Sequence, residues 1–532
     1  MRSENEHFET LTEDELWQRY CGFLDLSVDE FMDIQKELLM DEIERVSDSL
    51  LGRKIMGNRI PKSVEEFRHR VPLTTYDDYE PYLSKRQEDA LAEKPYLWCH
   101  SAGRGGYFKW IPYNSQFVDI VINGTLSGFI LASSGGRKGQ VNVSPGFRFL
   151  SILPPAPYAT GSVFQVIAQR FPFKIIPPLE TSENLEFHER IQRGFQIGLR
   201  DEVDLITGIA SILVKMGEAF SEHAQSMKFS WFMLHPKIIT RLIRAWFRSK
   251  KEKRGILPKD LWPVRAIATG GVDTAIYKED LTRYWGSEPY EFYGSTEVGL
   301  FAMQAWNKKW LTFSPSNAFL EFIPEEESLK YNENKNYQPT TVLLNEVKEG
   351  KLYEIVITQF YGMPLLRYPL RDLFRVVSLK DDETGIDLPQ VVFQRRVGET
   401  INIGGMAELD EKAIWRAIAN TGIKYTDWSA CKEYDQSQSY LRLYLELKEE
   451  RESGEIATII DEQIKVVDTD YKDIERYLGF QPVRVTLLSS GTFQRYIEEK
   501  RSEGADLAHL KPSHINPPEA VIQRLLCLSE VV

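Results

Sequence analysis

The chain has 532 residues, of which 42% are hydrophobic and 27% are charged, an ordinary composition for a globular protein. This composition excludes a disordered, collagen-like or mainly coiled-coil protein, and the length predicts more than one domain. The net charge of −13 disfavours a protein that coats nucleic acid, because such a protein would be basic.

The four cysteines are spread over the chain, and no two of them form a Cys-x-x-Cys pair. This spacing indicates neither a zinc ribbon nor a disulfide framework, so a reducing compartment is the simplest setting. The acidic N-terminus lacks the apolar core of a signal peptide, and apolar stretches such as Leu205–Val214 are too short to span a bilayer. We expect a cytoplasmic, soluble protein, a monomer or weak oligomer, that binds neither membrane nor nucleic acid.

Residues 11–24 and 28–52 are predicted to be helical, because apolar residues recur there at spacings of three and four. Thr12 and Asp29 are the expected N-caps. From about residue 95 to 400, strand-like and helix-like runs alternate, which predicts an α/β core with some antiparallel strands. The strand-like runs are FRFLSILP, VDLITGI, VRAIATGG, PYEFYGS, NAFLEFIP, YEIVITQF and QVVFQRR.

A basic run from Lys237 to Arg254 stands out in this acidic chain. We interpret it as a surface helix with a solvated basic end. An amphipathic helix on a membrane surface is the alternative.

The last strand-like run ends in a charged turn with a glycine, near Arg395–Glu399. The residues after it have helix and strand patterns of their own, sufficient for a small α+β domain. We therefore expect two domains, residues 1–396 and residues 397–532.

Two glycine-containing segments follow strand-like runs. His100–Lys109 has small residues that would let backbone N–H groups approach a phosphate, with charge from Arg104 and Lys109. It lacks the Gly-Lys-Ser/Thr of a Walker A loop, and a plain glycine-rich turn is the alternative. Ala268–Gly271 would let a flat ring lie against the backbone, or would simply form a strand-to-helix turn.

Two further segments combine several chemical groups. Phe292–Gly299 offers an aromatic ring that can stack on a base, hydroxyls for phosphate oxygens and a carboxylate for magnesium. Arg367–Asp372 places an aspartate where it could accept both hydroxyls of a ribose, and a turn or capping role is the alternative.

The order of these segments resembles the adenylate-forming superfamily. Tyr293–Glu297 is similar to its core motif, and Arg367–Asp372 to its ribose-binding motif. Phe393–Arg395, followed by Ile401–Gly405, is similar to its strand-to-hinge segment.

Within that superfamily the chain is most similar to the Gretchen Hagen family of acyl-acid amido synthetases. Ser314–Pro324 and Glu349–Thr358 carry this resemblance, and the most specific segments are Ser490–Phe493 and Glu503–Pro512. The phosphate loop departs from the family, since Arg104 stands where a hydroxyl residue is usual. The resemblance implies a large N-terminal adenylate-forming α/β domain of mixed sheets and helices, with a small C-terminal α+β domain.

The resemblance also implies an ATP-dependent ligase that forms an acyl-AMP from a carboxylic acid and transfers the acyl group to an amine, for which an amino acid is the expected acceptor. ATP and Mg²⁺ are the implied cofactors, with Glu297 as the metal ligand. Lys511 is the implied cation for the α-phosphate, and Arg495 and Lys500 on the preceding helix-like run are the alternatives. The residues implied to bind ATP or AMP are Ser101, Arg104, Thr269, Gly270, Gly271, Tyr293, Gly294, Ser295, Thr296, Asp372 and Arg395.

The hinge, the roles of three histidines and the rival functions complete the expectations. Val397–Gly398 is the expected hinge between the two half-reactions. His100, His509 and His514 lie next to candidate loops, although a structural role is the more frequent one for a histidine. An acyl-CoA ligase with a thiol acceptor, or a non-catalytic binding protein on the same fold, are the rival functions.

Overall fold

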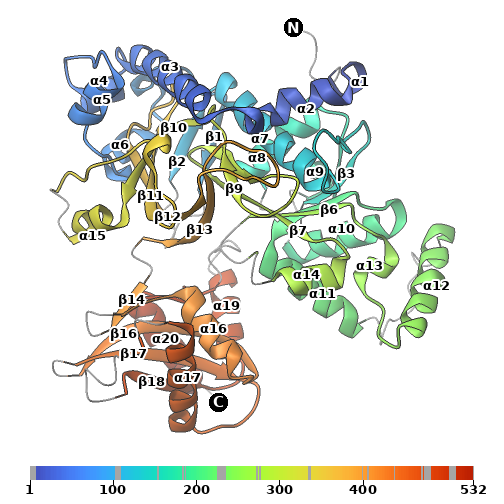
Figure 1. Cartoon of the computed structure of the whole chain (residues 1–532). Helices are drawn as coiled ribbons and strands as arrows, with labels where there is room; N and C mark the ends of the chain where they lie inside the picture. The colour runs from blue at the N-terminus through green and yellow to red at the C-terminus, as the bar shows by residue number, and fades with distance from the viewer. Residues whose placement is uncertain are drawn as a thin grey trace. The chain divides into compact units, whose positions relative to one another are not determined.

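The computed structural model describes residues 7–530, except residues 102–108, 152–154, 183–184, 186, 224–234, 271–273, 275–276, 334–336, 398–399, 404–406, 436–437, 469–470, 473–480 and 503–510. The chain forms two compact units, of which the first ends at Gln394 and the second begins at Arg395 (Figure 1). The boundary expected from the sequence, between residues 396 and 397, lies two residues further along the chain.

The N-terminal helices of the first unit begin at reciprocal caps. The Thr12 hydroxyl accepts from the Glu15 amide at 3.3 Å, and the Glu15 carboxylate accepts from the Thr12 amide at 2.8 Å. Ser27 and Glu30 form the same capping box before the next long helix, so the prediction of Asp29 as the N-cap is wrong. A serine three residues before a glutamate satisfies two amides at once. The helices are α1 (His7–Thr10), α2 (Glu13–Cys21), α3 (Val28–Val46), α4 (Leu50–Met56), α5 (Val64–Arg70) and α6 (Tyr76–Leu83).

One large sheet forms the framework of the first unit, with strand order β10-β11-β12-β13-β9-β8-β7-β6-β5-β3-β4. Strands β4, β3, β5, β6 and β7 pair in parallel. The pairs β7 with β8, β8 with β9, β9 with β13, β12 with β11 and β11 with β10 are antiparallel. This confirms the predicted α/β core with antiparallel additions. The strands are β3 (Arg148–Ser151), β4 (Lys174–Ile176), β5 (Leu205–Ile209), β6 (Ala266–Gly270), β7 (Pro289–Ser295), β8 (Gly299–Gln304), β9 (Leu311–Phe313), β10 (Ala318–Pro324), β11 (Leu352–Gln359), β12 (Tyr368–Ser378) and β13 (Gln390–Arg396).

A hairpin and further helices complete the first unit around this sheet. A two-stranded hairpin, β1 with β2, carries the two ends of the predicted phosphate loop. The elements are β1 (Leu97–His100), β2 (Trp110–Tyr113), α7 (Ser115–Ser133), α8 (Ala159–Arg170), α9 (Leu179–Ser182), α10 (Phe187–Asp201), α11 (Ala210–His223), α12 (Pro236–Lys251), α13 (Pro258–Leu261), α14 (Lys278–Trp285) and α15 (Glu325–Glu333).

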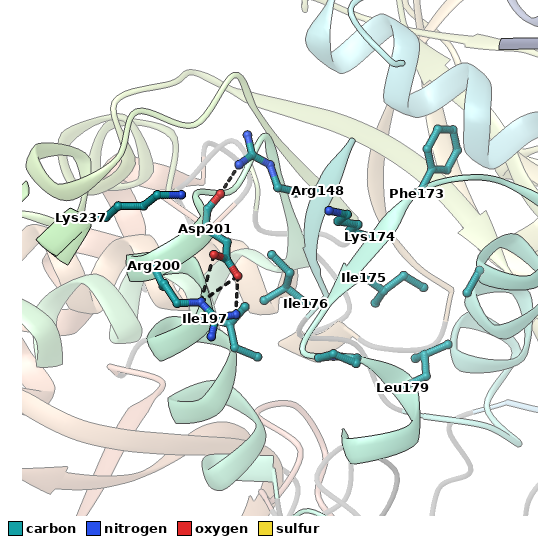
Figure 2. Close-up of a pocket in the computed structure, with 12 residues that line it drawn as sticks. Arg148, Phe173, Lys174, Ile175, Ile176, Leu179, Ile197, Arg200, Asp201 and Lys237 are labelled. Atoms are coloured by element: carbon teal, nitrogen blue, oxygen red, sulfur yellow. Dashed lines mark hydrogen bonds and ion pairs between the residues drawn. The ribbon is translucent and has the colours of Figure 1, made fainter. Parts of the chain in front are cut away.

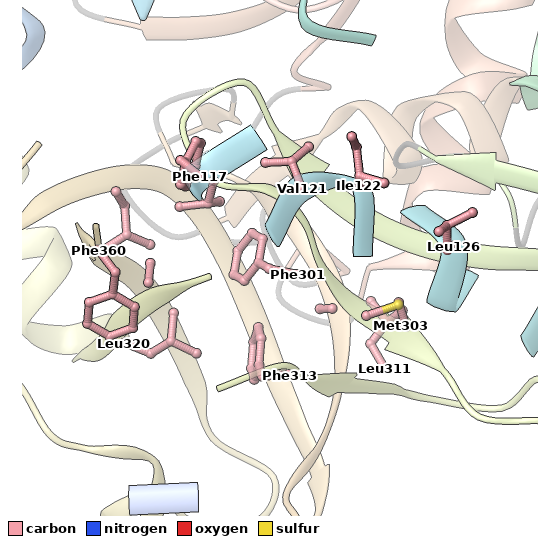
Figure 3. Packing of buried hydrophobic residues seen from close by; sticks show 14 of the residues in the cluster. Phe117, Val121, Ile122, Leu126, Phe301, Met303, Leu311, Phe313, Leu320 and Phe360 are labelled. Atoms are coloured by element: carbon pink, nitrogen blue, oxygen red, sulfur yellow. The ribbon is translucent and has the colours of Figure 1, made fainter. Parts of the chain in front are cut away.

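Helix α7 lies in the core of the first unit, where its apolar side chains pack against those of the sheet (Figure 3). Phe117 and Phe301 are both fully buried there. A Cβ atom at Gly124 would lie 2.4 Å from the carbonyl oxygen of Leu300, so this close approach of helix and strand requires glycine. The core therefore fixes β8, and with it the turn between β7 and β8.

Among the described residues, α7 is also the one helix long and apolar enough to cross a membrane. Two thirds of that apolar window, 67%, is buried inside the fold, as is also seen for core helices of other proteins.

The second unit is an α+β fold built on a three-stranded sheet of order β16-β17-β18. Strands β16 and β17 are antiparallel, whereas β17 and β18 are parallel. These elements follow the helix and strand patterns read from the sequence. They are β14 (Thr400–Ile403), β15 (Ala407–Asp410), α16 (Glu411–Asn420), β16 (Tyr425–Asp435), β17 (Gln438–Leu447), α17 (Ser453–Val467), β18 (Val483–Leu488), α19 (Thr492–Ser502) and α20 (Glu519–Glu530).

Candidate active site

The predicted core motif lies in the turn between β7 and β8, and side chains from other elements hold the backbone of this turn. The hydroxyl of Tyr113, on β2, donates to the carbonyl of Thr296 at 2.5 Å. The amide of Gln359, on β11, donates to the carbonyl of Glu297 at 2.5 Å, and that of Asn317 donates to the next carbonyl at 2.9 Å. The turn is thus fixed in advance of any ligand, as electrostatic stabilisation of a reacting group requires.

Two oxygen groups of this turn are buried without a described partner. The Glu297 side chain is 9% exposed, and its carboxylate forms no hydrogen bond or ion pair with another residue in the described part of the chain. The buried hydroxyl of Ser295 likewise has no hydrogen-bond partner among the described residues. Buried polar groups are usually satisfied, so the Ser295 hydroxyl points to a ligand, and the nearby Glu297 carboxylate has no described partner that would compete for it.

The charge of Glu297 reaches the phenols around it. Burial, together with the charges of Cys99 and Glu297, raises the pKa of Tyr113 well above its ordinary value. Burial also raises the pKa of Tyr76 to about 12, with smaller contributions from Glu80 and Glu297. Both phenols are therefore neutral hydrogen-bond donors at physiological pH.

A carboxylate and a hydroxyl are ligands that Mg²⁺ accepts, and Mg²⁺ commonly binds one or two carboxylates plus substrate phosphates. Within the described residues there is no group of three or more His, Cys, Asp or Glu side chains that could enclose a metal ion. The turn therefore fits a magnesium ion that arrives with a phosphate ligand and not an all-protein metal cage.

The second predicted element, the ribose motif, meets the core motif directly. The Tyr293 hydroxyl donates to Oδ2 of Asp372 at 2.5 Å, and Asp372 is 6% exposed. The Tyr293 ring lies edge-on to Phe374 at 4.7 Å and stacks on Phe393 at 6.0 Å between ring centroids. Tyr293 and Asp372, which are 79 positions apart in the sequence, thus form a hydrogen-bonded pair, and two aromatic rings pack against the Tyr293 ring.

An irregularity in the sheet directs Asp372. Val356 pairs with Pro369 and Glu354 pairs with Leu373, so one residue of β11 faces three residues of β12. Such bulges re-aim side chains next to functional sites. Arg371 within the bulge has a positive φ of 65°, which places Asp372 after a sharp backbone turn.

Arg367, the first residue of this motif, is an internal anchor. Its guanidinium donates to both carboxylate oxygens of Glu321 at 2.9 Å, and also to the carbonyls of Arg68 and Val71 at 2.5 Å. The side chain is buried and fully engaged. It fixes the start of β12 and has no donor free for a nucleotide.

The predicted glycine segment at the end of β6 packs against the neighbouring strand β7. The ring of Phe292, not that of Tyr293, packs against Gly270, where an added Cβ atom would lie 2.8 Å from the ring. Successive side chains of a strand point to opposite faces, so Tyr293 and Phe292 diverge. Thr269 is fully buried, and its hydroxyl bonds to that of Thr274 at 3.0 Å. Gly294 is exposed at the end of β7.

The ends of the predicted phosphate loop are held together. The Ser101 amide donates to the carbonyl of Lys109 at 3.0 Å, and the Lys109 ammonium donates to the Tyr368 hydroxyl at 2.9 Å. The loop therefore starts and ends beside the ribose motif. Arg104 and Gly271 lie outside the described residues, as does the side chain of Arg395.

In the second unit, Lys511 forms an ion pair with Asp427 at 2.7 Å, and the Lys511 side chain is 46% exposed. The segment that carries Lys511 lies along the edge strand β16. The Ala430 amide donates to the carbonyl of His514 at 2.6 Å, and the Asn516 amide donates to that of Ala430 at 2.8 Å. The alternative cation, Arg495, donates to the carbonyls of Ser490 and Leu528 and is thereby occupied.

His514 completes this cluster. It bonds to Asp427 at 2.8 Å and to Glu411 at 2.5 Å, and its ring stacks on Trp428 at 4.5 Å. Burial opposes the charged imidazole, but the two carboxylates outweigh it and raise the pKa of His514 to about 9. Burial by itself would raise the pKa of Asp427, but His514 and Lys511 hold the pKa of this carboxyl well below its usual range. A protonated His514 is a structural ion and not a general base. His509 and Gly398 lie outside the described residues.

His100 is packed between two aromatic rings, those of Trp110 and Tyr158, at 5.1 and 4.3 Å. Its Nδ1 lies 3.1 Å from the carbonyl oxygen of Ser101. It therefore supports the base of the phosphate loop.

Sequence reasoning did not single out Tyr113, Gln359 or Asn317. Each holds a carbonyl of the core-motif turn, but each comes from a distant part of the chain. No local pattern in the sequence marks such a role.

A cavity of about 610 Å³ lies elsewhere in the first unit, along the edge strand β4 (Figure 2). Arg148 donates to the Asp201 carbonyl, and Lys237 reaches into the same space from α12. Its lining includes none of the site residues predicted from the sequence. It is lined by Arg148, Ala168, Phe173, Lys174, Ile175, Ile176, Pro178, Leu179, Ile197, Arg200, Asp201 and Lys237.

Comparison with protein families gives matches to three models of one family. Residues 22–228 match the GH3 family N-terminal domain, residues 311–396 match the GH3 family central domain, and residues 410–519 match the GH3 family C-terminal domain. Together these matches cover more than half of the chain.

Several known proteins are similar along most of their length. The jasmonoyl–L-amino acid synthetase JAR4 of Nicotiana attenuata is 23% identical over 518 residues, with 86% of this chain and 87% of that protein covered. The 4-substituted benzoates–glutamate ligase GH3.12 of Arabidopsis thaliana is 22% identical, with 91% and 95% covered.

Solved structures share the fold. The AtGH3.15 acyl acid amido synthetase in complex with 2,4-DB superposes with a TM-score of 0.69 at 18% identity, covering 97% of each chain. The 2-hydroxyisobutyryl-CoA ligase in its postadenylation state with 2-HIB-AMP gives 0.61 at 13% identity, covering 95% of this chain and 92% of that one.

Proposed function

Because the chain belongs to the GH3 family, we propose that it is an ATP-dependent ligase that joins a carboxylic acid to the amino group of an amino acid. In the first step the carboxylate attacks the α-phosphorus of ATP, so that pyrophosphate leaves and an acyl-adenylate remains. In the second step the amine attacks the acyl carbon, the amide bond forms and AMP leaves. The relatives named as amino acid synthetases and glutamate ligase support this assignment.

The observation that carries the proposal is the core-motif turn. Its backbone carbonyls are held by Tyr113, Gln359 and Asn317, while Glu297 and Ser295 are left without described partners. An adenylation site needs this arrangement, because the reaction depends on positioning and charge neutralisation more than on an acid or base.

Each residue of the site would then have a stated task. Glu297 would hold Mg²⁺, which supplies charge neutralisation to the phosphates when it is bound. Ser295 and Thr296 would hold the α-phosphate oxygens. Asp372, oriented by Tyr293, would accept the ribose hydroxyls.

Lys511 would supply positive charge to the α-phosphate during adenylation. In the structure Lys511 is paired with Asp427. The proposal therefore requires Lys511 to exchange the carboxylate of Asp427 for a phosphate oxygen. The hinge at Val397–Gly398 would permit the C-terminal unit to turn between the two steps.

An acyl-CoA ligase remains the second candidate, because the fold is shared with a 2-hydroxyisobutyryl-CoA ligase. Both candidates form an acyl-adenylate and differ in the nucleophile of the second step. The family assignment favours the amine, since the named GH3 relatives are amino acid ligases.

The test is a pyrophosphate-release screen of the full chain over a panel of carboxylic acids, followed by acceptor trials. We expect release with a subset of acids, and mass spectrometry should then detect an amide with an amino acid. A thioester with CoA, and no amide with any amino acid, would assign the second candidate. Absence of pyrophosphate release with every acid would contradict adenylation itself.

We also propose a cytoplasmic location. The four cysteines, Cys21, Cys99, Cys431 and Cys527, are all free thiols in the structure, which is compatible with a reducing compartment. Fractionation of cells that express the tagged full chain would test this location.

A further inference from the structure

Helix α12 carries an apolar stripe that the fold does not cover. Ile239, Ile243, Trp246 and Phe247 are 40%, 51%, 49% and 62% exposed. Their spacings of four and three residues place them on one side of the helix. The other large exposed hydrophobic residues of the described chain are scattered singly, so this stripe is a distinct surface.

The helix is nevertheless firmly attached to the first unit. Ile238, Ala245 and Ser249 are buried on its inner side. Arg241 reinforces the attachment by donating to Glu202 at 2.8 Å and to the carbonyl of Leu199. The stripe is thus displayed on a fixed helix.

Positive charge accompanies the stripe. Within α12 there are six Lys or Arg residues and no Asp or Glu, although the whole chain has a net charge of −13. Lys237, Arg244 and Lys251 are exposed and form no ion pair with another described residue. With 100° between successive helix residues, these three lie on one flank of the apolar stripe.

The basic surface continues beyond the helix. Lys237 shares the cavity along β4 with Lys174, which comes from the strand itself (Figure 2). Lys174 also has no ion pair with another residue in the described part of the chain. Cations from two elements therefore gather where α12 begins, beside the Asp201 carboxylate, whose pKa is lowered mainly by Arg200 and further by Lys237 and Lys174.

We infer that α12 docks the protein onto the surface of a bilayer that contains anionic lipids. Trp and Phe side chains are favoured at the boundary between headgroups and acyl chains, and Lys and Arg next to them attract anionic headgroups. The apolar stripe of α12 provides the aromatic side chains, and its basic flank provides the cations, that such a boundary favours. This revises the expectation that the run is merely a solvated surface helix, because the structure leaves its apolar residues exposed.

An acidic protein partner would use the same charges but is the less favoured occupant. The stripe consists of four apolar side chains along one side of a single helix, each at least 40% exposed, and a bilayer surface can cover all of them at once. The Trp246 ring also lies 6.0 Å from the Lys250 ammonium, so aromatic and cationic groups are presented together.

The test is flotation of the full chain with vesicles of phosphatidylcholine alone or with phosphatidylserine. We expect binding to the anionic vesicles at low salt, weaker binding at high salt, and little binding to phosphatidylcholine alone. The double variant Trp246→Ala, Phe247→Ala should lower the partition coefficient by about tenfold or more, since each aromatic ring would otherwise be buried. The variant Arg244→Gln, Lys251→Gln should lose the preference for phosphatidylserine.

The matched control is Ile60→Ala with Leu379→Ala, which removes two hydrophobic side chains of similar exposure, 48% and 46%, outside the stripe. This control should bind vesicles like the wild type, and all variants should release pyrophosphate normally because none touches the candidate active site. Equal binding of wild type and the Trp246/Phe247 variant would overturn the inference. So would salt-independent binding to both vesicle types, or self-association in solution that the same variant abolishes while no vesicle is bound.

Discussion

The hydroxyl of Tyr293 donates a hydrogen bond of 2.5 Å to the carboxylate of Asp372. The first residue belongs to the core motif on β7 and the second to the ribose motif at the bulge of β12. This hydrogen bond joins the two predicted motifs, and we propose that the phenol orients the carboxylate for a ligand.

This relationship predicts graded effects on ATP binding. Asp372→Ala removes the charged acceptor and should weaken ATP binding by about 1.5–3 kcal/mol, the value of a hydrogen bond to a charged group. Tyr293→Phe keeps the ring and removes only the orienting hydroxyl, so its loss should be smaller, about 1 kcal/mol. Isothermal titration with ATP and Mg²⁺ measures both. Unchanged affinity in Asp372→Ala would contradict the ribose assignment.

Glu297 is predicted to carry the metal. Glu297→Gln keeps the shape of the side chain and removes its charge, so acyl-adenylate formation should fall about 100-fold or more. The loss should be partly overcome by raising the Mg²⁺ concentration, whereas a purely structural defect would not respond. Exchange of pyrophosphate into ATP is the measurement, and wild-type exchange in this variant would remove Glu297 from the mechanism.

Lys511 is predicted to serve only the adenylating step. Its ammonium would neutralise charge that grows on the phosphoryl oxygens during attack, so it should matter more in the transition state than in the ground state. Lys511→Ala should therefore bind ATP almost normally and release little pyrophosphate. Given a synthetic acyl-adenylate, the same variant should still form amide at a useful rate.

Lys500→Ala is the control for this prediction, because Lys500 lies on α19 and was the alternative cation. Arg495→Ala is a poorer control, because Arg495 donates to the carbonyls of Ser490 and Leu528, and its loss would destabilise the second unit. Normal adenylation by Lys511→Ala together with a defect in Lys500→Ala would show that the cation has been assigned to the wrong residue.

The cluster around His514 predicts a pH dependence of stability in the second unit. The pKa of His514 is raised from 6.5 to about 9 in the folded protein, so protonation favours the folded state. This contribution is fully present below pH 6.5 and is lost as the pH rises through about 9. We expect a loss of about 3 kcal/mol in the opening free energy of β16 to β18 across this window.

Hydrogen exchange of the full chain, resolved by peptide, measures that free energy. The variant His514→Gln should be less stable at the low end of the window and should show a much smaller slope with pH. His69→Gln, at an exposed position on α5, should retain the wild-type slope. A wild-type slope in His514→Gln would mean that other groups cause the pH dependence.

Local patterns in the sequence were sufficient to predict several strands and to indicate the family. The strand-like runs PYEFYGS and YEIVITQF correspond to β7 and β11. In β11 the run is rich in β-branched residues and buried from Tyr353 to Gln359, as is typical of a strand covered on both faces. The order of the motifs along the chain was also sufficient to indicate the family. The N-cap prediction at Asp29 was wrong although the correct one also depends on a local pattern, because the capping box of Ser27 with Glu30 can be read from the sequence.

Other features required the tertiary structure, because they depend on which distant residues meet. The contact of Tyr293 with Asp372, the anchoring of Arg367 by Glu321, and the pairing of Lys511 with Asp427 all join separate parts of the chain. Periodicity carries no information about such partners. Strand alternation places Phe292 and Tyr293 on opposite faces, but only the packing shows that Phe292 is the one against Gly270.

The basic run from Lys237 illustrates the same division. Its sequence determined an amphipathic helix, because apolar and charged residues alternate with the helical period. Which apolar residues are covered was decided by the fold: Ile238 packs inward, whereas Trp246 and Phe247 remain in solvent. Burial is a property of the neighbours that surround a side chain, and for α12 those neighbours come from α10 and α13, not from the helix itself.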